Sequence, residues 1–88
     1  MRLMWVQCHL AFVLSKAPGR ETEAITHYRE ALRLKPDFID ALNGLAIIYV
    51  QLGRPDQARA QWEAALKIDP ANEMIRNNLR LLQQMTGQ

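Results

Sequence analysis

The chain has 88 residues, of which 49% are hydrophobic and 23% are charged, with a formal net charge of +2, the composition of one small folded domain rather than of a disordered chain. Lys and Arg residues are scattered along the sequence, so no run of like charge points to a nucleic-acid surface. A single cysteine, Cys8, excludes an internal disulfide and is compatible with a reducing compartment such as the cytoplasm.

The first predicted element is a helix over residues 3–16, which ends before the helix-breaking Pro-Gly pair at 18–19. Apolar residues surround most of this helix, which is typical of a helix buried on several sides. The segment can also be interpreted as a weak signal peptide, with Arg2 ahead of the apolar run. Gln7 and His9 interrupt that run, which is too short to span a bilayer. We therefore favour an amphipathic helix and expect no membrane insertion by this chain.

Two further helices are predicted next. The second begins near Glu21, whose charge suits a helix N-terminus, and ends before Pro36. The third is expected to be capped by Asp37 and to run to about Leu52, with Gly53 as its stop. Each has an apolar stripe at helical spacing, which predicts one buried face. The stripes are Ala24, Ile25, Tyr28, Ala31, Leu32 and Leu34, and then Ala41, Leu42, Leu45, Ala46 and Tyr49.

The last two predicted helices have clear start signals. Pro55 suits the first turn of the fourth helix, which ends before Pro70. Asn72 is expected to cap the fifth helix, which runs to about Met85 and is closed by Gly87. The fifth helix is polar on most sides, which is the pattern of a terminal cap with a wet outer face. Its apolar stripe is Ile75, Leu79 and Leu82.

An internal repeat of 34 residues, the distance from Gly19 to Gly53, relates these helices to one another. Small residues and one aromatic residue at helical spacing, repeated at this period, are typical of helix hairpins that stack on one another. The sequence therefore predicts an all-α fold of five helices, in which antiparallel hairpins stack as a short solenoid. The repeated positions are Gly19, Arg20, Ala24, Tyr28, Ala31, Leu32, Leu34 and Pro36, matched by Gly53, Arg54, Ala58, Trp62, Ala65, Leu66, Ile68 and Pro70.

On these residues the chain resembles the tetratricopeptide repeat family. Residues 39–72 fit one full repeat, and the first repeat fits from Gly19 onward. The leading helix of the first repeat fits if Pro18 is an insertion, because Leu10-Ala11 otherwise lies one place too early against Leu45-Ala46. The resemblance implies one right-handed solenoid domain over 1–88, with repeats at 1–38 and 39–72 and a capping helix at 73–88.

The recurring residue types first have a packing explanation. Ala46 and Ala58 are expected to be small because the two helices of a hairpin cross there, and Ala65 lets the next helix approach. Tyr49 and Trp62 are expected to fill the space between repeats.

The resemblance implies a scaffold that binds a protein or peptide along the concave face, which the first helix of each repeat lines. An apolar surface with a few amides suits an extended or helical peptide with hydrophobic anchors. Family members that clamp a C-terminal carboxylate use asparagine and cations where this chain has Gly44, Met74 and Asn78, which argues against chaperone-tail peptides. The expected partner-binding residues are Trp5, Cys8, Phe12, Asp40, Asn43, Ile47, Val50, Met74, Asn77 and Leu81.

Two alternatives to groove binding remain open at this point. The apolar first helix can pack on a second copy, giving a homodimer or a repeat-swapped module, or the chain is the C-terminal part of a longer array. We do not expect an enzyme, because His9 and His27 lie on different helices and no serine, cysteine or carboxylate is spaced as a base–nucleophile pair. No catalytic residue, cofactor or metal ligand is predicted, and neither nucleic acid nor a membrane is an expected partner.

Overall fold

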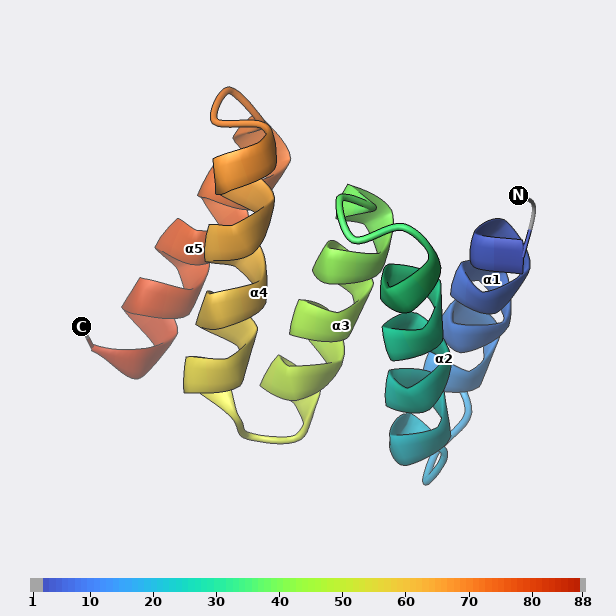
Figure 1. The fold of residues 1–88 in the computed structure, drawn as a ribbon. Coiled ribbons are helices and arrows are strands. Elements are labelled where there is room, and N and C mark those ends of the chain that lie inside the picture. Colours follow the sequence, from blue (N-terminus) through green and yellow to red (C-terminus); the bar gives the residue numbers. More distant parts are fainter. Residues whose placement is uncertain (1–2, 88) are drawn as a thin grey trace.

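The computed structural model describes residues 3–87, which form five α-helices and no strand (Figure 1). The helices follow one another in a row, and the pairs α1–α2 and α3–α4 are antiparallel hairpins, with α5 packed after them (Figure 1). The predicted all-α hairpin fold is thus confirmed, whereas Arg2 lies outside the described residues. The helices are α1 (Leu3–Ser15), α2 (Glu21–Leu34), α3 (Ile39–Gln51), α4 (Pro55–Ile68) and α5 (Glu73–Thr86).

Most of the predicted helix ends are confirmed by the backbone. Gly53 follows α3 with φ of +73°, a conformation that side chains disfavour. Its N–H donates to the carbonyl of Val50 at 3.0 Å, and the N–H of Arg54 donates to the carbonyl of Tyr49 at 2.8 Å, which completes a Schellman motif. At the start of α5, the side chain of Asn72 accepts a hydrogen bond from the N–H of Ile75 at 3.1 Å.

The predicted cap of the third helix is wrong. The residue at the N-cap of α3 is Phe38, and no side chain caps the helix there. Asp37 instead accepts a hydrogen bond from Nζ of Lys35 at 2.8 Å, which lowers the pKa of this carboxyl group. The Phe38 ring is buried and meets Trp5 edge to face at 4.7 Å between centroids. Burying an aromatic ring stabilises the fold by more than the roughly 1 kcal/mol of a side-chain cap, so the ring decides where the helix begins.

A single apolar core runs through both hairpins. The predicted small residues Ala46, Ala58 and Ala65 are completely buried, as close helix crossings require. Ala11 is also completely buried, as expected if one residue is inserted before Gly19 so that Ala11 matches Ala46. Tyr28 and Trp62 are buried side chains from the second helix of each hairpin. The large core therefore lies between the hairpins as well as within them.

The two ends of the row differ. In α5, Ile75 and Leu82 are buried while Arg76 and Arg80 are exposed, which agrees with the predicted polar cap. In α1, Ala11 is the only buried residue among those described, although the helix is strongly apolar. None of the helices within residues 3–87 is long and apolar enough to cross a membrane.

Candidate functional site

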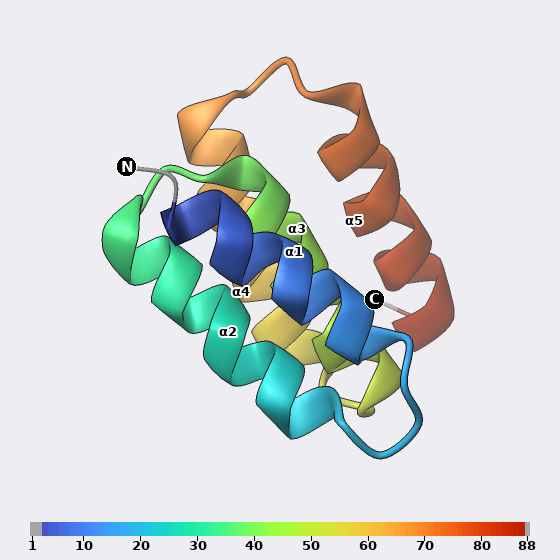
Figure 2. The ribbon, with the colours of Figure 1, turned by 90° about the vertical axis from the view of Figure 1, so that its right-hand side faces the viewer.

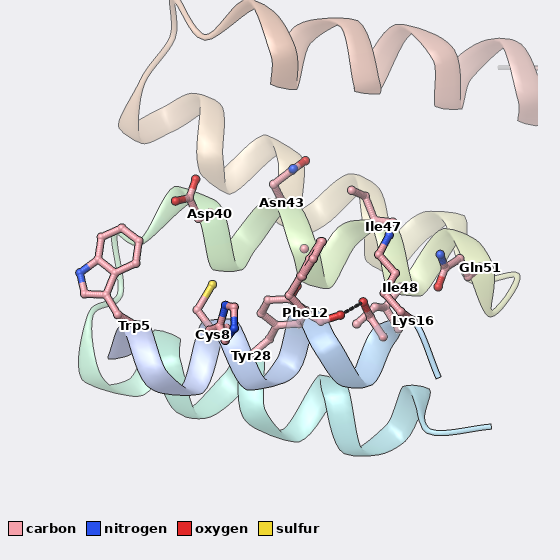
Figure 3. Close-up of a pocket in the computed structure, with 13 residues that line it drawn as sticks. Trp5, Cys8, Phe12, Lys16, Tyr28, Asp40, Asn43, Ile47, Ile48 and Gln51 are labelled. Carbon is pink, nitrogen blue, oxygen red and sulfur yellow. Dashed lines mark hydrogen bonds between the residues drawn. The ribbon is translucent and has the colours of Figure 1, made fainter. Parts of the chain in front are cut away.

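A groove runs along the face that carries the first helix of each hairpin. Between α1 and α3 lies a hollow of about 350 Å³, lined by side chains of both helices (Figure 3). A second hollow of about 190 Å³ lies between α3 and α5. Both hollows are lined by Ile47 and Gln51, so they lie next to each other on either side of α3, and we call the two together the groove. Figure 2 shows α1, α3 and α5 on this side of the molecule.

The structure brings eight of the ten expected binding residues to the groove. Met74 is half exposed and is not among the lining residues, while Asn77 lies in a separate polar hollow with Glu73, Arg76 and Arg80. Asn77 thus lies on the outward, polar side of α5, whereas Met74 belongs to the stripe of Asn78 and Leu81 but lies one turn before them. The eight that line the groove are Trp5, Cys8, Phe12, Asp40, Asn43, Ile47, Val50 and Leu81.

Sequence reasoning missed two kinds of lining residue. His9 and Lys16 extend the helical stripe of Trp5 and Phe12, so a strict count of i, i+4 positions on α1 finds them. Tyr28 and Trp62 come from the second helix of each hairpin and reach the groove between the first helices. No signal from the first helices alone points to them.

Contacts on the groove wall hold the exposed aromatic rings of α1 in place. Trp5 is 54% exposed, yet one edge of its ring packs on the buried Phe38. Phe12 is 52% exposed, and Nζ of Lys16 lies 4.9 Å from the centre of its ring, a cation–π contact. These rings are therefore ordered apolar surface that a partner can cover at little cost in side-chain entropy.

Gly44 makes room for Tyr28 at the base of the first hollow. A Cβ atom at position 44 would overlap the Tyr28 ring, so the ring lies directly against the backbone of α3. Burial raises the pKa of Tyr28 to about 12, with smaller contributions from Cys8 and Asp40. The phenol therefore stays protonated at neutral pH and contributes to the hollow as a neutral hydrogen-bonding group.

Asn43 connects three helices beside the second hollow. Its Oδ1 accepts hydrogen bonds from Nε1 of Trp62 at 2.8 Å and from Nδ2 of Asn78 at 3.0 Å. Because this amide oxygen already has two donors, its remaining capacity to bind a ligand lies in its own NH₂ group.

The groove contains no activated nucleophile. Burial, followed by the charge of Asp40, raises the pKa of the Cys8 thiol, so the reactive thiolate is disfavoured. Over residues 3–87, no three His, Cys, Asp or Glu side chains gather as metal ligands would. What the groove offers is an apolar surface with a few polar groups, a composition that is typical of binding sites.

A sequence comparison identifies the repeat. The profile described as tetratricopeptide repeat matches residues 16–85. The chain belongs to the tetratricopeptide repeat family. The 34-residue period, the crossing alanines and the aromatic residues between hairpins are thus features of tetratricopeptide repeats in this chain.

Several curated proteins resemble this tetratricopeptide repeat chain. Photosystem I assembly protein Ycf3 of Cyanophora paradoxa is 32% identical over 74 residues, covering 68% of this chain and 43% of the relative. The protein of the same name from Synechococcus is 33% identical over 72 residues, with 78% and 42% covered. Uncharacterized protein y4yS of Sinorhizobium fredii is 37% identical over 65 residues, with 74% and 36% covered. The chain thus spans less than half the length of these relatives.

Proposed function

We propose that this tetratricopeptide repeat chain binds a peptide segment of a protein partner in the groove. The observation that carries the proposal is that two hollows lie next to each other and share Ile47 and Gln51 of α3. Four large apolar side chains on the groove walls are between 42% and 55% exposed, which makes them available as contacts for apolar anchors. They are Trp5, Phe12, Ile47 and Leu81.

The family and its relatives support a role in protein interaction. Two of the relatives are named photosystem I assembly proteins, and assembly of a complex requires contact with other proteins. The segment that these relatives share with this chain is the repeat region. We therefore assign to this chain the capacity to bind a protein, but we do not assign to it the partner of those relatives.

Charge at the two ends of the first hollow favours one direction of the bound segment. Figure 3 shows Asp40 beside Trp5 at one end, and Lys16 beside Gln51 at the other. A peptide with an apolar or aromatic anchor, a basic group toward Asp40 and an acidic group toward Lys16 complements this arrangement. Exposed charges of this kind contribute more to orientation and to the rate of binding than to affinity.

Selection of random peptides displayed on phage tests the proposal. Phe12 and Val13 are neighbours that are each 52% exposed, but only Phe12 lines the groove. We expect enriched peptides to bind the unaltered chain and the Val13→Glu variant alike, and to lose binding to Phe12→Glu. Enriched peptides should carry an aromatic or large aliphatic residue between a basic and an acidic residue.

Two outcomes would contradict groove binding. One is the absence of any enriched peptide. The other is a set of peptides whose binding to Phe12→Glu equals that to Val13→Glu, when circular dichroism shows that both variants keep the helical content of the unaltered chain.

A further inference from the structure

The side chain of Tyr28 reaches the base of the first hollow with a hydroxyl group that the protein does not satisfy. Tyr28 is only 3% exposed, yet its ring lines the hollow between α1 and α3. Within residues 3–87 the hydroxyl has no hydrogen-bond partner, and every fully enclosed side-chain oxygen or nitrogen there does have one. The Tyr28 hydroxyl therefore opens into the hollow.

The equivalent ring of the second repeat has its polar end satisfied inside the protein. Trp62 is 4% exposed, and its indole N–H donates to Oδ1 of Asn43 at 2.8 Å. Buried tyrosine and tryptophan side chains usually find a partner for their polar end. The second hollow supplies this partner from α3, whereas the first hollow leaves the polar end of its ring open to a bound group.

A carboxylate lies about one helical turn from the open hydroxyl. A Cβ atom at position 44 would overlap the hydroxyl of Tyr28, so this group occupies the side-chain site of Gly44. Asp40 is four residues earlier on α3, and side chains at this spacing are neighbours on one face of a helix. Burial raises the pKa of Tyr28 and of the Cys8 thiol, and the charge of Asp40 contributes to both shifts.

The side chain of Asp40 is free to bind a cation. It is exposed, it lines the hollow, and in the part of the chain that the structure describes it forms neither an ion pair nor a hydrogen bond. Its place in the first turn of α3 suits the positive end of the helix dipole. That interaction uses the charge alone, so both carboxylate oxygens remain available as acceptors.

An aromatic ring completes this end of the hollow. Figure 3 shows Trp5 on α1 beside Asp40, and the ring of Trp5 is 54% exposed. Tryptophan is the side chain over which cations are held best. The Lys16 ammonium lies over the Phe12 ring at the other end of the hollow. One end therefore combines a negative charge, an open hydroxyl and an aromatic ring; we call Trp5, Tyr28 and Asp40 together the Asp40 pocket.

We propose that the Asp40 pocket binds the guanidinium group of an arginine side chain in the peptide segment held by the groove. The proposal rests on groove binding for the peptide that carries the arginine. A guanidinium has five N–H donors in a planar fork, so it can donate to the Asp40 carboxylate and to the Tyr28 hydroxyl oxygen while lying against Trp5. The ammonium group of lysine is not planar and is more strongly hydrated, so it fits these three groups less well.

An NMR titration of the folded chain tests the pocket without a peptide of known sequence. The probes are Nα-acetyl-arginine methylamide and the matching citrulline compound, in which a neutral urea group replaces the guanidinium. We expect the arginine probe to shift the resonances of the Trp5 indole N–H and the Gly44 amide until the pocket is saturated. The citrulline probe should leave them unchanged, and the lysine compound should bind more weakly than the arginine probe.

Two matched changes of aspartate to asparagine separate the pocket from net charge. Asp37 is paired with Lys35, its side chain is 63% exposed, and it does not line the hollow. Asp40→Asn should weaken binding of the arginine probe at least about fivefold, and Asp37→Asn less than about twofold. Tyr28→Phe removes one acceptor and should weaken binding by about two- to tenfold. Circular dichroism checks that the three variants keep the helical content of the unaltered chain.

Four results would overturn the proposal. They are the absence of saturable shifts with the arginine probe, equal binding of the arginine and citrulline probes, equal effects of Asp40→Asn and Asp37→Asn, and tenfold tighter binding of free L-arginine than of the capped probe. The last result would assign the pocket to a small molecule rather than to a peptide.

The same variants distinguish failure of the pocket from failure of groove binding. Phage-selected peptides that bind the unaltered chain and Asp40→Asn equally well would refute the pocket and leave groove binding intact. Saturable binding of the arginine probe, with no enriched peptide, would refute groove binding and leave the guanidinium site.

Discussion

The two repeats place an aromatic residue at the same position and accommodate it differently. Tyr28 lies against α3 where Gly44 has no side chain, so the ring meets the backbone. Trp62 lies in the second hollow among mainly apolar side chains, and its indole N–H donates to Asn43 of α3, which also accepts from Asn78 of α5. Both repeats thus place a large ring between hairpins. The position on the facing helix is Gly44 in one case and Asn78 in the other, and the Asn78 amide donates to the same Asn43 oxygen as the indole N–H.

The first helices of the two repeats differ in burial even at positions where both carry an aliphatic residue. Ile48 of α3 is 1% exposed and its counterpart Val13 of α1 is 52% exposed, although both are β-branched and aliphatic. Position in the stack therefore decides how much each apolar residue contributes to stability.

The largest expected effect is at the ring of the second repeat. Trp62→Ala should lower the free energy of unfolding by about 3–5 kcal/mol, because it leaves a cavity between α3, α4 and α5 and removes the hydrogen bond to Asn43. Urea denaturation followed by circular dichroism measures the change. Trp62→Phe keeps most of the ring volume and should cost less, and an unchanged midpoint for Trp62→Ala would contradict this placement of the ring.

A pair of matched substitutions to alanine separates the effect of position in the stack on stability from the effect of residue type. Ile48→Ala should cost about 2–5 kcal/mol, as for a buried aliphatic side chain. Val13→Ala should change the free energy of unfolding by less than about 0.5 kcal/mol, because the side chain is already half in water. Equal losses in the two variants, measured by the same denaturation, would show that α1 is covered in solution.

The smallest of the three effects tests the contact between Gly44 and Tyr28. Alanine favours a helix over glycine by about 1 kcal/mol, yet Gly44→Ala should destabilise the chain by about 1–3 kcal/mol because its Cβ overlaps the ring. In a Tyr28→Leu background the overlap is relieved, and the same change should become neutral or stabilising. A double-mutant cycle from thermal or urea unfolding measures the difference. Additive effects would refute the contact.

Much of the fold followed from local signals in the sequence. Gly53, Pro55 and Asn72 act through their own backbone or side chain within one helical turn, so their roles were predicted and found. The prediction that Asp37 caps α3 was wrong because burial of the Phe38 ring beside Trp5 decides where the helix begins. Trp5 and Phe38 are distant in the sequence, so no local signal shows this contact.

The expected binding face was recovered most fully on α1 and α3 and least on α5. The periodicity of the sequence shows which residues share one face of a helix. The direction in which that face points depends on how the helix is rotated against its neighbours. In α5, Ile75 and Leu82 set this rotation, which turns Asn77 away from the groove and leaves Leu81 in it.

The sequence by itself determined the repeat, the helix hairpins and the positions of the small and aromatic residues, since these depend on spacing along one chain. Tertiary structure alone decided which apolar residues are covered and which remain open. Burial is a property of what packs against a side chain, and similar residues such as Val13 and Ile48 meet water at the end of the row and protein in its middle.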